Sequence, residues 1–175
     1  MSNKKALIIT GNMVQDHEFI YPFYRLKEEG IAVDVFNGSN QQVLGFFGTK
    51  VPPQKDDSIV DLKDIDEINY DLLVIPGGVK AMEHMRLNRD LIKLINQFHE
   101  KKKLIACICS GIFLMISAKI IKNKKVSGYY AWQDDIENAG GLFVDSEVVI
   151  DGNLVTSPHY KFVGEWMGKV ISLIK

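Results

Sequence analysis

The chain has 175 residues, of which 46% are hydrophobic and 25% are charged, and its formal net charge is −1. This length and composition predict one globular domain that covers residues 1–175. A charge so close to zero gives no reason to expect nucleic acid or a membrane as a partner, and no apolar run reaches the roughly 18 residues of a spanning helix. The apolar run near the N-terminus is also too short for a secretory leader, so the cytoplasm is the expected location.

The first part of the chain predicts alternating strands and helices. Residues 5–10 form a short apolar strand, and residues 17–29 have helical spacing that stops at Gly30. Residues 31–37 alternate as a second strand does. Residues 38–60 predict an excursion with two short hairpin strands.

The second part continues the same alternation. A buried strand at 70–78 is followed by an amphipathic helix at 88–102 with Asn88 as its N-cap. A strand then runs into Cys109, and an apolar helix follows it directly. Further short strands are predicted within 125–130 and 142–157, and a terminal helix within 161–175. The apolar face of that last helix comprises Val163, Trp166, Met167, Val170, Ile171 and Ile174.

Strands that alternate with helices of this length predict an α/β fold, with an open and mostly parallel sheet covered on both faces. In such a sheet, the working site lies beyond the carboxyl ends of the strands. Three strand ends are therefore of interest: Thr10-Gly11-Asn12, Pro76-Gly77-Gly78 and Cys109-Ser110-Gly111.

Cys109 has the sequence context of a nucleophile elbow. Small residues, Cys107 and Gly111, stand two positions before and after it, as a sharp strand-to-helix turn requires. A following helix N-terminus favours the reactive thiolate, and the backbone N–H groups of Ser110 and Gly78 are candidates for an oxyanion hole. The alternative is an ordinary buried cysteine, which behaves as a small hydrophobe.

The other cysteine, Cys107, has core packing as its expected role. Two cysteines in one strand are poorly placed for a disulfide, and with no histidine nearby they make a poor metal site, so no metal is expected.

Six segments occur in the order and spacing of one protein family: EFIYPFYRLKEEGIAVDV (18–35), DLLVIPGG (71–78), MRLNRDL (85–91), IACICSG (105–111), DDIENAGG (134–141) and DGNLVTS (151–157). Through them nearly the whole chain resembles the ThiJ/PfpI family, in the superfamily of the parkinsonism-associated deglycase and class I glutamine amidotransferases. The resemblance implies a flavodoxin-like three-layer sandwich, a homodimer or larger homo-oligomer, and a reactive cysteine at Cys109.

Two positions depart from the pattern that this resemblance implies. Peptidase-like members carry a histidine after the cysteine, where this chain has Ser110, and serine is no base near neutral pH. The family also places a glutamate against the sulfur, and the motif alignment puts Gln15 at that position. A glutamine amide can donate to a thiolate but cannot transfer a proton, so we expect Cys109 to be partly activated while glyoxalase-type or deglycase-type turnover is weak or absent.

Two acids lie next to Gln15 in the sequence. Asp16 is expected to cap the first helix, and Glu18 to stabilise the positive end of its dipole. Either carboxylate is also a possible substitute for the missing glutamate.

Three residues are candidates for the pocket lining. His17 opens the first helix, His159 follows a strand end, and Tyr129 matches a family stretch whose tyrosine lines the site. For each histidine, the alternative is an ordinary surface position, and for Tyr129 it is core or dimer packing.

The sequence leaves several functions open. The first is a Cys109-dependent small-molecule enzyme, a hydrolase or a glyoxalase or deglycase, and the second is a stress protein whose Cys109 reacts with oxidants or electrophiles without turnover. A third is a catalytically silent family member with a structural or regulatory role. A flavin carrier is disfavoured because residues 13–16 lack hydroxyl donors for a phosphate, so no cofactor is expected.

Overall fold

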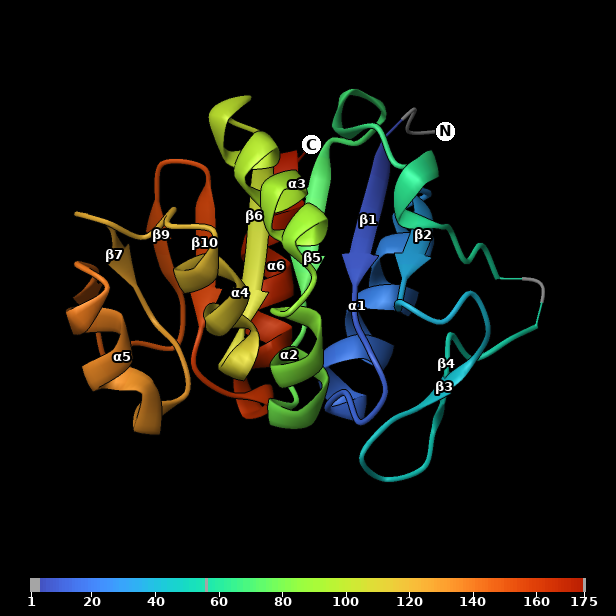
Figure 1. Cartoon of the computed structure of the whole chain (residues 1–175), viewed down its shortest axis with the longest axis horizontal. Coiled ribbons are helices and arrows are strands. Elements are labelled where there is room, and N and C mark those ends of the chain that lie inside the picture. The colour runs from blue at the N-terminus through green and yellow to red at the C-terminus, as the bar shows by residue number, and fades with distance from the viewer. Residues whose placement is uncertain (1–3, 56, 175) are drawn as a thin grey trace.

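One six-stranded sheet organises the molecule. The computed structural model describes residues 4–55 and 57–174. The strand order is β2-β1-β5-β6-β10-β9, in which only β9 runs antiparallel to its neighbour (Figure 1). The strands are β1 (Lys5–Ile9), β2 (Ala32–Phe36), β5 (Leu72–Ile75), β6 (Leu104–Ile108), β9 (Val149–Asp151) and β10 (Leu154–Ser157). The prediction of a mostly parallel sheet is confirmed.

Helices cover both faces of this sheet. Helices α1 (Asp16–Glu28) and α6 (Val163–Ile174) pack against each other behind it in the view of Figure 1. Helices α2 (Val79–Met85), α3 (Arg89–Glu100) and α4 (Ile112–Ser117) lie in front of it. The result is the three-layer, flavodoxin-like sandwich that the family resemblance predicts.

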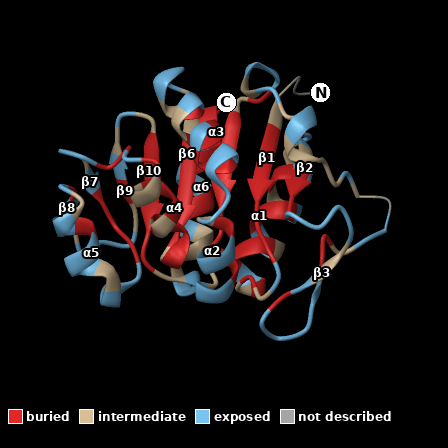
Figure 2. Ribbon diagram, viewed as in Figure 1, coloured by how far each residue is buried: buried red, intermediate tan, exposed pale blue. Residues whose placement is uncertain are grey.

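The central strands are buried on both sides, as a parallel sheet between two helical layers requires (Figure 2). All four residues of β5 are inaccessible to solvent. Helix α6 contributes its predicted face to the same core, since Trp166, Met167, Val170, Ile171 and Ile174 are buried and Val163 packs against the cluster. Cys107 is buried in β6, as predicted.

Local signals in the sequence also match the structure. The Asn88 side chain accepts hydrogen bonds from the backbone of Asp90 and Leu91, both at 3.1 Å, and so caps α3. Gly30 ends α1 with a φ of 72°, which is typical of glycine at this position. The excursion after β2 contains the predicted antiparallel pair, β3 (Val43–Leu44) and β4 (Lys50–Val51).

A smaller layer lies beyond the β9 edge. It contains the parallel pair β7 (Lys125–Val126) and β8 (Leu142–Phe143), with α5 (Gln133–Asn138) between them in sequence. Within the ranges that the structure describes, no helix is long and apolar enough to cross a bilayer.

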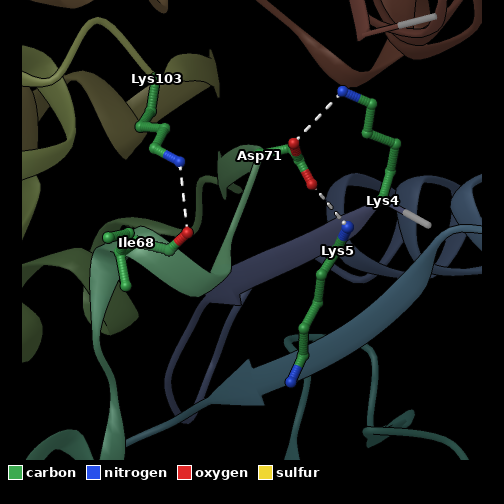
Figure 3. Close-up of polar contacts among 5 residues, drawn as sticks. All are labelled: Lys4, Lys5, Ile68, Asp71 and Lys103. Atoms are coloured by element: carbon green, nitrogen blue, oxygen red, sulfur yellow. Dashed lines mark hydrogen bonds and ion pairs between the residues drawn. The ribbon is translucent and has the colours of Figure 1, made fainter.

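The amino ends of the strands are held together by a group of charged residues (Figure 3). The Asp71 carboxylate accepts a hydrogen bond from the Lys5 backbone at 3.0 Å and pairs with the Lys4 ammonium at 3.3 Å. Nearby, the Lys103 ammonium donates to the Ile68 carbonyl at 3.4 Å. The Asp71 contacts join the start of β1 to the start of β5 and support the register of these two strands. The Lys103 contact joins the residue before β6 to the turn that precedes β5.

Asp16 has a different role from the predicted one. The N-cap of α1 is Gln15, and the buried Asp16 carboxylate accepts hydrogen bonds from the backbone of Phe47 at 2.8 Å and Thr49 at 3.1 Å. The prediction of a helix cap was wrong because a turn 31 residues away in sequence brings backbone donors to this carboxylate. Asp16 thereby holds the β3–β4 hairpin against the start of α1.

We predict that Asp16→Ala lowers the free energy of unfolding by about 1–3 kcal/mol, because two part-buried backbone N–H groups lose their charged acceptor. Urea denaturation measures the change. Asp64→Ala, at an exposed aspartate in a short 3₁₀ turn, is the control and should change stability by less than about 0.5 kcal/mol. Equal effects of the two substitutions would contradict the assignment.

Candidate functional site

Cys109 occupies a sharp turn at the carboxyl end of β6. Its φ is +58°, a left-handed conformation that is unfavourable for a residue with a Cβ. The chain passes from β6 into a single 3₁₀ turn, Cys109–Gly111, and then into α4. The thiol is half-buried and free. This is the backbone geometry that a nucleophile elbow needs.

Two glycines make room for this turn. A Cβ on Gly111 would lie 2.6 Å from the Ile75 carbonyl oxygen, which explains the small residue two positions after Cys109. A Cβ on Gly77 would lie 2.8 Å from the Cβ of Cys109 and would also collide with the Glu18 carboxylate. The chain segments at the ends of β5 and β6 can therefore approach closely only because Gly77 and Gly111 have no side chain.

Glu18 lies beside the sulfur. It is fully buried, one Oε accepts a hydrogen bond from the Gly77 backbone at 2.7 Å, and the carboxyl group lies beside Cys109, where its negative charge raises the pKa of the thiol. Gln15 lines the same cavity, but its Oε1 lies 3.4 Å from the His17 ring. The structure thus corrects the alignment of Gln15 with the family's sulfur-contacting carboxylate, since Glu18 has that position.

The reason for this error is local geometry. Gln15 is an extended N-cap residue, and α1 begins one residue later. Glu18, near the end of the first helical turn, lies on the face that meets the strand ends. It lies in the first turn of α1, as expected of a carboxylate at the positive end of the helix dipole, and it is buried there.

Burial controls the electrostatics of this pair. It raises the pKa of Glu18 to about 7, although hydrogen bonds from Gly77, Cys109 and the Tyr160 backbone oppose the rise. Burial also raises the pKa of the Cys109 thiol to about 12; the negative charge on Glu18 adds to this, and the Ser110 backbone N–H opposes it. Glu18 is therefore the group that loses a proton first, near neutral pH.

The predicted depression of the thiol pKa does not occur. The helix after Cys109 has only six residues and is separated from the thiol by the 3₁₀ turn, so its dipole is small. Protonation of Glu18 removes the repulsive charge, so the thiolate is most accessible when the proton of the pair resides on Glu18.

An open cavity of about 360 Å³ lies over the thiol. Its floor is polar and its walls are largely aromatic. The lining residues are Met13, Gln15, Glu18, Phe46, Gly78, Val79, Lys80, Cys109, Ser110, Tyr129, Trp132, His159 and Tyr160. Six separate segments of the chain contribute to it, as expected for the carboxyl edge of a parallel sheet.

The predicted lining residues are only partly brought together. Tyr129 and His159 line the cavity, as do Gly78 and Ser110 with their backbone groups. His17 is not among the lining residues: it is exposed and stacks on the outer side of Tyr160, with ring centroids 5.1 Å apart. The expectation that His17 lines the cavity is therefore corrected: Tyr160 lines it, and His17 stacks on Tyr160.

Residues that the sequence reasoning missed come from distant segments. Phe46 reaches the cavity from the β3–β4 hairpin, and Tyr160 from the turn after β10. Of the residues missed, only Glu18 could have been predicted from the sequence, because it follows the N-cap of the first helix by three residues and so lies in its first turn. Among the described residues, no group of three or more histidine, cysteine, aspartate or glutamate side chains is placed to hold a metal ion.

The sandwich fold, with a cysteine on a tight strand-to-helix turn beside a buried glutamate, defines a protein of the ThiJ/PfpI type. The chain belongs to the DJ-1/PfpI family, whose sequence profile matches residues 4–173. Deglycase PfpI of Pyrococcus furiosus is 37% identical over 174 residues, covering 98% of this chain and 99% of that protein. Deglycase TK1284 of Thermococcus kodakarensis is 37% identical over 173 residues, covering 98% of this chain and 99% of that protein.

Solved structures agree with this assignment. A two-domain protein from Anabaena variabilis, with DJ-1/ThiJ/PfpI-like and ferritin-like domains, superposes with a TM-score of 0.90 and 29% identity over 98% of this chain. This chain spans 48% of that longer protein. DJ-1beta of Drosophila melanogaster superposes with a TM-score of 0.88 and 26% identity, covering 99% of this chain and 91% of that one.

We predict that Cys109→Gly is more stable than Cys109→Ala by about 1 kcal/mol, because glycine adopts a positive φ without steric cost. Urea denaturation of both variants at one pH tests this. The same pair at Cys107, inside β6, should show the opposite order. The same order at both positions would exclude strain at Cys109.

We also predict that Glu18→Gln is stabilising, and only above acidic pH. The pKa of Glu18 is raised from 4.5 to about 7 on folding, so its ionisation favours the unfolded chain. The stability of the native protein is unaffected below pH 4.5 and decreases as the pH rises from 4.5 to about 7, by at most about 3 kcal/mol.

Urea denaturation at pH 4 and pH 8 measures this difference. Glutamine does not titrate and can still accept a hydrogen bond from Gly77. The variant should therefore be more stable than the native protein at pH 8, and this advantage should be absent at pH 4. Glu165→Gln, at an exposed position of α6, is the matched control and should show no such gain. A pH-independent effect of Glu18→Gln would contradict the raised pKa.

Proposed function

We propose that this protein is a cysteine-dependent enzyme that acts on small reactive carbonyl compounds, with Cys109 as the nucleophile and Glu18 as the proton carrier. The observation that carries the proposal is the buried Glu18 carboxyl group beside the Cys109 thiol, with both residues lining one open cavity. A carboxyl group with a pKa of about 7 exchanges protons readily at neutral pH.

The first step is addition of the thiol to an aldehyde. Glu18 takes the thiol proton, the sulfur forms a bond to the carbonyl carbon, and the electron pair of the C=O bond moves to the oxygen. The backbone N–H groups of Gly78 and Ser110 are the proposed donors to that oxygen. Glu18 then returns the proton to it, which gives a neutral hemithioacetal.

With a 2-oxoaldehyde, the same carboxylate completes an internal redox reaction. Glu18 removes the proton from the hemithioacetal carbon and delivers it to the neighbouring carbon, while the hydroxyl proton of the hemithioacetal passes to the neighbouring oxygen. The former aldehyde carbon thus becomes the carbonyl of a thioester, and the former ketone becomes a hydroxyl group. Water hydrolyses the thioester to a 2-hydroxy acid and restores the thiol. The net change is addition of one water, and no redox cofactor takes part.

The relatives support this reaction class, because two proteins that are 37% identical over nearly the whole chain are named deglycases. A peptidase role is disfavoured. Ser110 follows the cysteine, and amide cleavage needs an imidazole or equivalent acid to protonate the leaving amine. The earlier expectation of weak glyoxalase-type chemistry depended on Gln15, and Glu18 removes its basis.

The second candidate is a thiol that responds to oxidants or electrophiles without turnover. Cys109 is half-buried, has a positive φ and lies in an open cavity, so it suits this role as well. The two candidates differ in one measurable property, the release of product with regeneration of the thiol. Assembly into a homodimer or a larger homo-oligomer stays a prediction.

We predict that the native protein converts methylglyoxal to lactate without added thiol, and that Glu18→Gln lowers kcat/KM at least 100-fold, as expected for loss of a general acid–base. Cys109→Ser should abolish the reaction. Lactate release measures turnover, and Glu165→Gln is the control. An active Cys109→Ser variant would overturn the proposal, and alkylation of native Cys109 without lactate would establish the second candidate.

The pH dependence of alkylation supplies a second measurement. The rate of Cys109 alkylation by iodoacetamide should rise only at high pH in the native protein, because burial and the Glu18 charge together raise the pKa of the thiol to about 12. In Glu18→Gln, the inflection should move to lower pH but stay above 9, the ordinary value for a thiol, because the charge is removed and burial remains. Coincident profiles would show that the Glu18 charge does not act on the sulfur.

A further inference from the structure

His159 has an unusual hydrogen-bonding arrangement for a cavity histidine. It lies two residues after the end of β10 and caps the 3₁₀ turn Tyr160–Phe162. Its Nδ1 accepts a hydrogen bond from the Lys161 backbone at 3.2 Å. The ring also lines the cavity that contains Cys109.

This hydrogen bond determines the tautomer of the ring. A backbone N–H can only donate, so Nδ1 carries the lone pair and the proton of the neutral ring lies on Nε2. Burial lowers the pKa of His159, and the Lys161 charge lowers it further, so the neutral form predominates at neutral pH. In this state His159 offers the cavity a donor and no free lone pair. It is therefore unsuited to take a proton from Cys109.

The ring is held in place by aromatic neighbours. The centroid of Tyr160 lies 4.0 Å from that of His159 on one side, and Tyr129 is stacked at 6.1 Å. Tyr160 is itself stacked against His17 on its outer side. A ring fixed by a backbone hydrogen bond and by stacking presents its Nε2–H at one position.

Two other polar groups of the cavity, the Trp132 Nε1–H and the Ser110 hydroxyl, are buried and have no hydrogen-bond partner among the described residues. The charged and amide side chains are engaged elsewhere: Glu18 accepts from Gly77 beside the thiol, and Gln15 lies against His17. The Lys80 ammonium is bound by Glu83 at 2.7 Å. His159 thus supplies a neutral N–H donor in the wall, next to a floor where the carbonyl carbon would react.

We propose that the Nε2–H of His159 is a specificity-determining donor that binds a second oxygen of the substrate, the one on the carbon next to the reacting aldehyde. It thereby favours 2-oxoaldehydes over simple aldehydes of the same size. This inference rests on the proposed addition of Cys109 to aldehydes, but it adds a residue and a selection rule that the addition itself does not require.

Two substitutions separate the two ring nitrogens. In His159→Asn, the short amide oxygen can still accept from the Lys161 backbone and cap the turn, but nothing replaces Nε2. In His159→Gln, the longer amide can bring an N–H donor close to the position of Nε2. His84→Asn, at an exposed histidine of α2 outside the cavity, is the matched control.

The readout is reversible binding, so that it does not depend on turnover. Aldehydes that form a hemithioacetal protect Cys109 from iodoacetamide, and the concentration for half-protection is compared for methylglyoxal and propionaldehyde. In His159→Asn, that concentration should rise about 5–10-fold for methylglyoxal, as expected for one lost hydrogen bond, and less than about twofold for propionaldehyde. His159→Gln should recover most of the selectivity, and His84→Asn should not change it.

The outcomes distinguish the two proposals. Selective protection without lactate formation would support the role of His159 and remove the proposed turnover. Equal loss of protection for both aldehydes, or no loss for either, would overturn the role of His159 even if lactate is formed. A long-range ¹H–¹⁵N spectrum of the full protein, assigned with His159→Asn, tests the tautomer directly: Nε2–H is expected, and a proton on Nδ1 would overturn the inference.

Discussion

The hydrogen bond between the Glu18 carboxylate and the Gly77 backbone is the interaction on which the site depends. It fixes a carboxyl group at a position with no solvent access, between the end of β5 and the thiol of the neighbouring strand. Removing an acid from water is costly, and the protein reduces that cost by keeping the acid protonated up to about pH 7. The same burial that costs stability makes the acid useful for proton transfer.

Backbone geometry sets the remaining conditions for this pair. Gly77 and Gly111 let the ends of β5 and β6 approach so closely that the Cys109 turn, the Glu18 carboxyl group and the Ser110 N–H meet at one point. In this arrangement Cys109 has a positive φ, which is unfavourable for a residue with a side chain. The strain, the buried acid and the raised pKa of the thiol are three costs at the same place, which is typical of a functional site rather than of a packed core.

The walls of the cavity are assembled differently from its floor. The floor comes from strand ends, whereas the walls come from the β3–β4 hairpin and from the turns that follow β7 and β10. Asp16 holds the hairpin in place, and His159 caps the last of these turns. Loops fixed by such local hydrogen bonds can change the substrate preference while the sheet preserves the reacting groups.

Sequence patterns alone determined the α/β architecture, the apolar face of α6, the Asn88 cap and the position of Cys109 at a strand end, because each depends on residues close together in the chain. They did not determine which carboxylate meets the sulfur, since Gln15 and Glu18 differ by less than one helical turn and only the packing of α1 against the strand ends selects Glu18. They also did not place Phe46 or exclude His17, because hairpin docking and ring stacking join segments that are distant in sequence. Local periodicity encodes the elements, whereas the chemistry of the cavity depends on long-range contacts that only the tertiary structure decides.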